Sequence, residues 1–305
     1  MATSRLKIFA SQYHISGLTN ETLNYLENGR YDMGKADAFL LFQSKVNQEF
    51  LSHPVICDNS YTKWFSGAEL NDAQVKHFII QFSVFFNQFL VAQLQKMINA
   101  DTVTQMREIR GVLANELGVL FNDKSFKLSG HKKNSVSENE NVRSLNSSIE
   151  GGHFHFKAGH FELILRMAEN IGLDYRLLGK RKKGKSTTLS CCDEIVCLYG
   201  SEDYPTSMAA AYAFESWAAA GYSDQLLVGL NRYKTINQKS HFPLAFFSWH
   251  SQLEITQGRI LQENLEAYYF NTDVDEEAFI AVGHKTLDAM ATFWNGLNDE
   301  RKKLH

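Results

Sequence analysis

Two ionisable side chains stand one helical turn apart in the stretch 245–263. His250 and Glu254 are four residues apart, and this spacing places both side chains on one face of an α-helix. Large apolar residues surround the pair in the sequence, so we expect this face to point into the protein. A buried carboxylate needs a partner, and either the neighbouring imidazole or a metal ion bound by both groups would serve.

Further glutamates and histidines stand beside apolar residues on other segments of the chain: Glu116, His153, His160 and Glu215. Helical proteins hold one or two metal ions with such a mixture, because carboxylates neutralise the ions and imidazoles complete their coordination. The sequence also allows ordinary roles, with Glu116 on the surface and the two histidines in a polar part of the core or on the surface. The metal-site hypothesis therefore requires that these side chains converge.

Long segments with an apolar periodicity of 3.6 residues predict that helices position these side chains. The chain has only three prolines, Pro54, Pro205 and Pro243, and each stands near an expected helix end. We predict an all-α fold in which residues 1–305 form a single compact helical bundle. The expected helices span 36–52, 72–99, 103–121, 150–172, 187–199, 206–231, 243–263 and 276–297. In the helix 150–172, His153 and His160 would share one face, two turns apart.

Three segments lack a firm helical pattern. Residues 1–34 form an N-terminal extension, and 54–70 a connection. Residues 122–149 are rich in serine, asparagine, lysine and glutamate, which predicts a long polar insertion loop. A basic run at 180–185 is expected to be a solvated loop, because no aromatic residues are interleaved with its charges.

Composition narrows the class of protein. The net charge of −3 is spread along the chain, which excludes a global nucleic-acid or membrane-binding surface. No apolar run reaches the roughly 20 residues of a membrane span, and the N-terminus lacks a secretory signal, so we expect a cytoplasmic protein. The four cysteines show no CxxC spacing and are expected to be reduced and mostly buried. No phosphate-binding loop or nucleophile elbow occurs, so no nucleotide cofactor is predicted.

Four motifs together resemble a known family. They are NELG at 115–118, GHFELILRMAENIGLD at 159–174, AFESWAAAGYSDQLLVGL at 213–230 and FFSWHSQLE at 246–254. In their order and approximate spacing, over roughly residues 60–300, they are similar to the heme-oxygenase-like diiron oxidase family, which has the TenA-like and pyrroloquinoline-quinone-synthase-like helical fold. This resemblance implies metal ligands at Glu116, His160, Glu215, His250 and Glu254, with Glu215 and His250 at the catalytic centre.

The sequence departs from this family at one expected ligand. The family pattern His-x-x-x-Asp/Glu-x-x-His ends with a histidine, where this chain has Gln257. A neutral amide is a poorer ligand for Fe(II) than an imidazole. His153 could replace the missing imidazole or take the ligand position of His160. We therefore expect two Fe(II) ions, or one.

The function that the resemblance implies is that of a non-heme iron oxidase or oxygenase, which would activate O2 to oxidise a small organic substrate. Two alternatives stay open. One is a metal-free TenA-like or cofactor-free enzyme of the same fold, which would need a catalytic cysteine or acid. The other is a helical binding protein that has lost catalysis, which Gln257 and the basic run favour. The expected partners are the substrate and O2, with no nucleic acid and no membrane, and a homodimer is left open.

Overall fold

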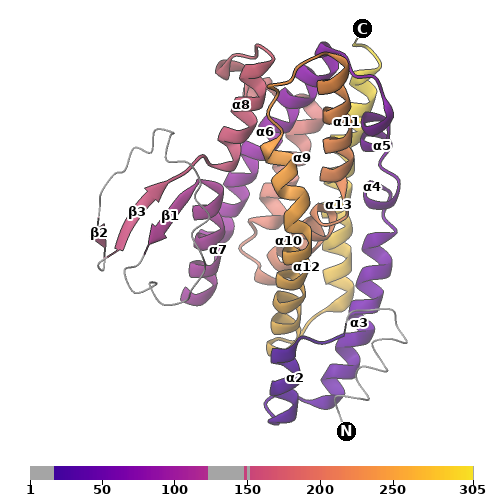
Figure 1. Ribbon diagram of the computed structural model, residues 1–305. Helices are drawn as coiled ribbons and strands as arrows, with labels where there is room; N and C mark the ends of the chain where they lie inside the picture. The colour runs from indigo at the N-terminus through magenta and orange to yellow at the C-terminus, as the bar shows by residue number, and fades with distance from the viewer. Residues whose placement is uncertain (1–16, 123–147, 150–151, 305) are drawn as a thin grey trace.

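Helices packed around one apolar core make up most of the structure, a computed structural model that describes residues 17–122, 148–149 and 152–304 (Figure 1). Within these ranges the side chains are described except at 120–122, 148–149, 152–155 and 251–261. In chain order the helices are α2 (Asn20–Glu27), α3 (Met33–Leu51), α4 (Pro54–Cys57), α5 (Ser60–Gly67), α6 (Asp72–Ile98), α7 (Val103–Glu116), α8 (His160–Asn170), α9 (Ser186–Tyr199), α10 (Tyr204–Ala218), α11 (Tyr222–Ile236), α12 (Ala245–Asn271) and α13 (Glu276–Arg301). The all-α prediction is confirmed.

Local signals in the sequence account for several helix starts. Asn71 caps α6 and forms a capping box with Gln74, and Thr102 does the same for α7. Asp275 caps α13 by accepting a hydrogen bond from the backbone of Ala278. Such caps satisfy the free amides of the first turn. They begin these helices within a residue of the predicted positions.

The helix α6 lies at the centre of the aromatic core. Phe78, Phe82, Phe85 and Phe89 are all buried, and their rings contact aromatic rings of α10, α12 and α13. Among the described residues, α6 is the one helix that is long and apolar enough to cross a membrane, but 61% of its most apolar stretch is buried inside the protein. Its apolarity is that of a core helix.

A small antiparallel sheet lies beside α7, at the left of the bundle in Figure 1. Its strands are β1 (Val119–Asn122), β2 (Ser148–Ile149) and β3 (Gly152–Phe156), in the order β1-β3-β2. The predicted helix 150–172 is therefore wrong in its first part, and only α8 is helical. Glycines disfavour a helix at its start, and the alternation of histidine and phenylalanine in GHFHF has the period of a strand. His153, paired with Asn122 across the sheet, is not two helical turns before His160.

Several other boundaries differ from the predictions. The helix expected at 103–121 ends at Glu116, because Gly118 adopts a left-handed φ of 70°. The helix expected at 206–231 is divided into α10 and α11 by Gly221, which has a φ of 84°. The connection 54–70 contains the short helices α4 and α5. Most of the predicted insertion 122–149 lies outside the described residues.

Candidate metal centre

Two glycines bring the end of α7 against the start of α8. A Cβ atom added to Gly159 would lie 2.8 Å from the carbonyl oxygen of Glu116, and one added to Gly118 would overlap the carbonyl oxygen of Lys157. The backbones touch here, and the amide of Lys157 donates a hydrogen bond of 2.8 Å to the carbonyl of Gly118. Because Glu116 is the last residue of α7 and His160 the first of α8, this contact holds their side chains together.

The side chains of Glu116 and His160 meet directly. His160 Nδ1 lies 2.6 Å from Glu116 Oε2, and the two side chains are 15% or less exposed. Yet His160 Nδ1 is a buried nitrogen without a hydrogen-bond partner of acceptable geometry. The nitrogen and the oxygen approach each other without the alignment of a hydrogen bond. The contact is an ion pair between an imidazole nitrogen and a carboxylate oxygen, two donor types that a cation could also bind.

His250 of α12 brings a second imidazole to the same place. The ring centroids of His160 and His250 are 5.2 Å apart. His250 Nδ1 lies 2.7 Å from the carbonyl oxygen of Phe246, which assigns the proton to Nδ1 and leaves Nε2 as an acceptor. Burial lowers the pKa of His250 to about 4, so the imidazole is neutral at physiological pH. A neutral imidazole with its Nδ1 held by a carbonyl is the form that binds metal ions.

Aromatic rings surround the two imidazoles. The Trp249 ring lies 4.4 Å from that of His160, and the Phe246 ring lies 4.1 Å from that of His250. Phe86 of α6 is about equally far from both, at 6.2 and 6.1 Å. These rings give the imidazoles an environment of low polarity, in which charge interactions are stronger than in water.

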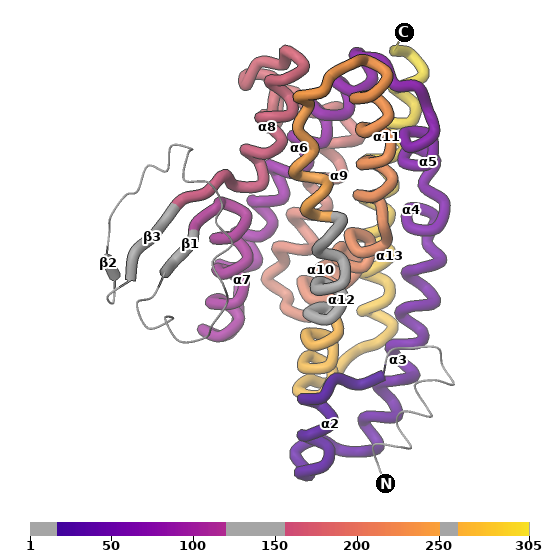
Figure 2. Tube along the Cα trace, in the orientation of Figure 1, coloured from indigo at the N-terminus to yellow at the C-terminus, as the bar shows by residue number. Residues whose placement is uncertain are grey.

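Glu215 is a second acidic candidate, in the last turn of α10. Figure 2 shows α10 beside α12, against which it packs. Burial raises the pKa of Glu215 to about 7, repulsion from the Glu116 carboxylate adds to this rise, and the Lys96 ammonium opposes it. Two carboxylates that repel each other in a buried place favour a cation between them.

Two residues near the candidate metal centre, Lys96 and Tyr199, were not predicted from the sequence. Lys96, near the end of α6, donates from Nζ to the carbonyl of Ser207 at 3.2 Å and lies 4.6 Å above the Tyr199 ring. Burial raises the pKa of Tyr199, and the carboxylates of Glu215 and Glu116 contribute to this rise. In the sequence, Lys96 is an ordinary polar position of a helix, because only the packing of α6 on α9 and α10 gives it buried neighbours.

The structure describes the side chains of four predicted metal ligands and leaves two, Glu254 and His153, outside the described ones. The structure brings Glu116, His160 and His250 together, with Glu215 within electrostatic reach. Glu254 follows His250 by one turn of α12, but its side chain, like those of His153 and Gln257, is outside the described ones. Among the side chains that the structure does describe, no group of three or more His, Cys, Asp or Glu is arranged to hold a metal ion. The donor types, carboxylate and imidazole, nevertheless fit Fe(II).

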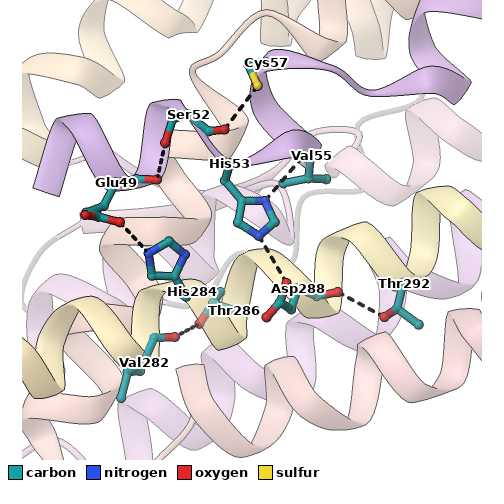
Figure 3. Close-up of polar contacts among 10 residues, drawn as sticks. All are labelled: Glu49, Ser52, His53, Val55, Cys57, Val282, His284, Thr286, Asp288 and Thr292. Carbon is teal, nitrogen blue, oxygen red and sulfur yellow. Dashed lines mark hydrogen bonds and ion pairs between the residues drawn. The ribbon is translucent and has the colours of Figure 1, made fainter.

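Other histidines are occupied in structural pairs. Figure 3 shows His53 Nε2, 3.1 Å from Asp288 Oδ1, and His284 Nε2, 3.2 Å from Glu49 Oε2. Both pairs join the α3–α4 region to α13. His53 also caps α4, since its Nδ1 accepts a hydrogen bond from the amide of Val55. In Figure 3 the two carboxylates lie on different sides of the histidine pair and do not converge, so these residues stabilise the helix packing.

Comparisons with known proteins bear on the fold. No family model matches the chain, and no curated protein matches its sequence. Among solved structures, it is similar to a domain of unknown function with a heme oxygenase-like fold from Shewanella denitrificans OS217. That similarity has a TM-score of 0.56 and 13% identity, and it covers 85% of this chain and 91% of that one.

Two further structures are similar. A CADD-like protein of unknown function from Nostoc punctiforme PCC 73102 has a TM-score of 0.56 and 18% identity, over 86% of this chain and 98% of that one. A TenA homolog from Pseudomonas syringae pv. tomato str. DC3000 has a TM-score of 0.57 and 10% identity, over 87% and 93%. At these identities the likeness shows the fold alone. The predicted heme oxygenase-like, TenA-like helical fold is therefore confirmed.

Proposed function

We propose that this chain, which has a heme oxygenase-like fold, is a non-heme iron-dependent oxidase or oxygenase acting on a small organic substrate and O2. The observation that supports it most is the meeting of Glu116, His160 and His250 from three helices. Glu215, on a fourth helix, is close enough for the Glu116 carboxylate to raise its pKa. Acids and imidazoles are otherwise costly to bury together.

In this proposal Glu116, His160, Glu215 and His250 would hold the metal. Glu254, whose side chain is outside the described ones, stays a predicted ligand. Bound iron would supply the activation of O2. The Phe246 carbonyl orients His250 by accepting a hydrogen bond from its Nδ1–H group. In the metal-free protein burial raises the pKa of Glu215 to about 7, so metal binding near neutral pH would release the proton that this carboxyl group still holds.

The substrate would meet an apolar wall. Phe86 and Trp249 are partly exposed, although their rings flank the two imidazoles. They would exclude water from the reacting groups and contact an apolar or aromatic part of the substrate. The four cysteines are free thiols, which agrees with a reducing compartment, and we place the enzyme in the cytoplasm.

Iron loading tests the proposal. After anaerobic addition of Fe(II) and removal of the excess, we expect about one to two ions per chain. His250→Ala should weaken binding at least about tenfold, since it removes an imidazole ligand. His241→Ala is the matched control, because His241 is exposed. Elemental analysis of both variants and of the unchanged protein gives the answer. Negligible binding, or equal binding in both variants, would sink the proposal.

A metal-free enzyme of the same fold is the second candidate. Lys96 favours it, because its ammonium supplies Glu215 with a counter-charge in the absence of a metal ion. This candidate predicts turnover that persists after chelation, whereas the iron enzyme predicts complete loss.

A cysteine nucleophile has little support in either case. Cys191 and Cys192 are buried, and burial raises the pKa of both thiols, that of Cys192 to about 12. Such thiols are poor nucleophiles. We therefore expect alkylation of the native protein to modify the exposed Cys57 and Cys197 and to leave turnover within about twofold of the untreated enzyme. Thiamin-analogue hydrolysis that alkylation abolishes would instead support a thiol mechanism.

A binding protein without catalysis receives less support from the basic run at 180–185. Arg181 forms a bidentate ion pair with the carboxylate of Asp193, at 2.6 and 2.7 Å. Lys185 Nζ lies 3.7 Å from Glu300 Oε1. Two of the five positive charges of this run thus lie beside acids.

A further inference from the structure

A small cavity lies where α10 turns into α11. Its volume is about 10 Å³, which is close to the room that one water molecule needs. Ala220 and Tyr222 line it on either side of Gly221, whose left-handed φ of 84° makes the turn. Asn59 and Thr62 complete part of the wall from the start of α5, the helix against which α11 packs (Figure 1).

Three residues that line this cavity each have a buried polar atom without a hydrogen-bond partner. The atoms are Asn59 Nδ2, Trp217 Nε1 and Gln225 Oε1, and none of them has a partner within the part of the chain that the structure describes. The residues Asn59 and Trp217 are only 8% and 1% exposed. A buried polar atom without a partner is costly. Three such residues around one cavity therefore point to a shared partner.

Other contacts hold the two donor side chains in place. Asn59 Oδ1 caps α5 by accepting hydrogen bonds from the amides of Tyr61 and Thr62, at 3.1 and 3.2 Å. This cap assigns the amide oxygen of Asn59 and leaves Nδ2 as the end without a partner. The Trp217 indole stacks on the Tyr222 ring at 4.2 Å. A ligand of this cavity would thus meet donors that are already fixed.

The chemistry of the three atoms matches one small molecule. Two of them are N–H donors and the third is a carbonyl acceptor. A cation would face two N–H groups, and an anion would face the carbonyl oxygen. Water can accept two hydrogen bonds and donate one, which is the usual number for a buried water. A cavity of this volume has no room for a larger molecule.

We propose that this cavity is a binding site for a single water molecule, which accepts hydrogen bonds from Asn59 and Trp217 and donates one to Gln225. The water joins α5, α10 and α11 at the turn that Gly221 makes. This inference goes beyond the proposed function and does not depend on it, because the site needs no metal ion.

A crystal structure at about 1.5 Å resolution tests the proposal directly. We expect one density peak within about 2.7–3.2 Å of Asn59 Nδ2, Trp217 Nε1 and Gln225 Oε1. A crystal soaked in bromide should show no anomalous signal at this place. A direct hydrogen bond from either donor to Gln225, with no peak between them, would overturn the proposal. An anomalous peak would also overturn it, because it would identify an anion site.

Stability in solution gives a test of sign. Gln225→Met removes the acceptor and keeps a side chain of similar size. If a water bridges the three atoms, this change should lower the folding equilibrium constant at least about fivefold, because the water loses one partner and the two helices lose a joint. If the oxygen has no partner, its removal should leave the constant unchanged or raise it.

Gln48→Met is the matched control, at an exposed glutamine of α3. It should change the constant less than about twofold. Urea unfolding of both variants and of the unchanged protein gives the comparison. A Gln225→Met protein that is as stable as the unchanged one would contradict the water bridge.

Nuclear magnetic resonance tests the water without any loss of stability. The indole N–H signal of Trp217, assigned by its loss in Trp217→Phe, should show a cross-peak to water. The sign of that cross-peak should be that of a nuclear Overhauser effect with a long-lived water, and opposite to that of proton exchange. A Trp217 indole signal without this cross-peak would refute the site.

Discussion

Gly118→Ala is expected to lower the free energy of unfolding by about 2–4 kcal/mol and to separate Glu116 from His160. Two costs contribute. Gly118 has a φ of 70°, a left-handed conformation that costs a residue with a Cβ about 1–2 kcal/mol. The added methyl group would also overlap the Lys157 carbonyl and lie 2.8 Å from the Gly159 nitrogen. Both neighbours are backbone atoms, so neither can rotate away.

The displacement acts on the candidate centre. Glu116 and His160 are each within two residues of this backbone contact, and their side-chain atoms are only 2.6 Å apart. A shift of about 1 Å between the end of α7 and the start of α8 would therefore disturb both ligands at once. We expect Fe(II) binding at least about tenfold weaker than in the unchanged protein.

Gly172→Ala is the matched control. Gly172 also has a left-handed φ, of 73°, but a Cβ atom there would have nothing within 4 Å. This variant should show only the conformational cost of about 1–2 kcal/mol and should bind iron normally. Urea unfolding and metal content of both variants distinguish the two costs. If Gly118→Ala bound iron as well as the control does, the backbone contact would not be what positions Glu116.

Local sequence signals predicted most of the helices but not the sheet. The capping residues Asn71, Thr102 and Asp275 begin their helices where expected, because a cap depends on residues only three positions away. The strand β3 was missed because its pairing with β1 joins residues more than thirty positions apart. A periodicity that two histidines and two phenylalanines define is too short to distinguish strand from helix.

The meeting of three candidate ligands was predictable from the sequence, their surroundings were less so, and their role as ligands stays a prediction. Glu116, His160 and His250 follow from residue types and their order along the chain, and the structure brings them together. Lys96 could not be predicted, because its role depends on α6, α9 and α10 meeting in space. The same holds for Gly118 and Gly159, which the sequence placed inside the helices expected at 103–121 and 150–172.

Glu215→Gln is expected to remove a pH dependence from the stability of the metal-free protein. Burial and the Glu116 carboxylate raise the pKa of Glu215 from 4.5 to about 7. The folded protein therefore holds this proton more tightly than the unfolded chain does. The stability that the protonated carboxyl contributes is fully present below about pH 4.5 and is lost as the pH rises through about 7. We expect a loss of about 2–3 kcal/mol over this range.

Comparing the pH dependence of stability in the unchanged protein and in Glu215→Gln isolates the contribution of this residue. His250 also changes stability with pH, because burial lowers its pKa to about 4, but it does so in both proteins. Urea unfolding after chelation, from pH 4 to pH 8.5, should give equal stabilities for the unchanged protein and Glu215→Gln at the acidic end. Above pH 7 the variant should be more stable by about 2–3 kcal/mol. Glu202→Gln, at an exposed glutamate, should follow the unchanged protein throughout.

The direction of this effect connects stability to metal binding. An ionised Glu215 costs the metal-free protein stability, and the same ionised group is the one that a metal ion binds. Added Fe(II) should stabilise the unchanged protein more than Glu215→Gln. Above pH 7 it should therefore make the unchanged protein the more stable of the two. If the stabilities of the two metal-free proteins changed with pH in parallel, Glu215 would be solvated or fully paired in the folded protein. Its carboxylate would then not need a cation to offset its charge, and Glu215 would no longer support a metal site here.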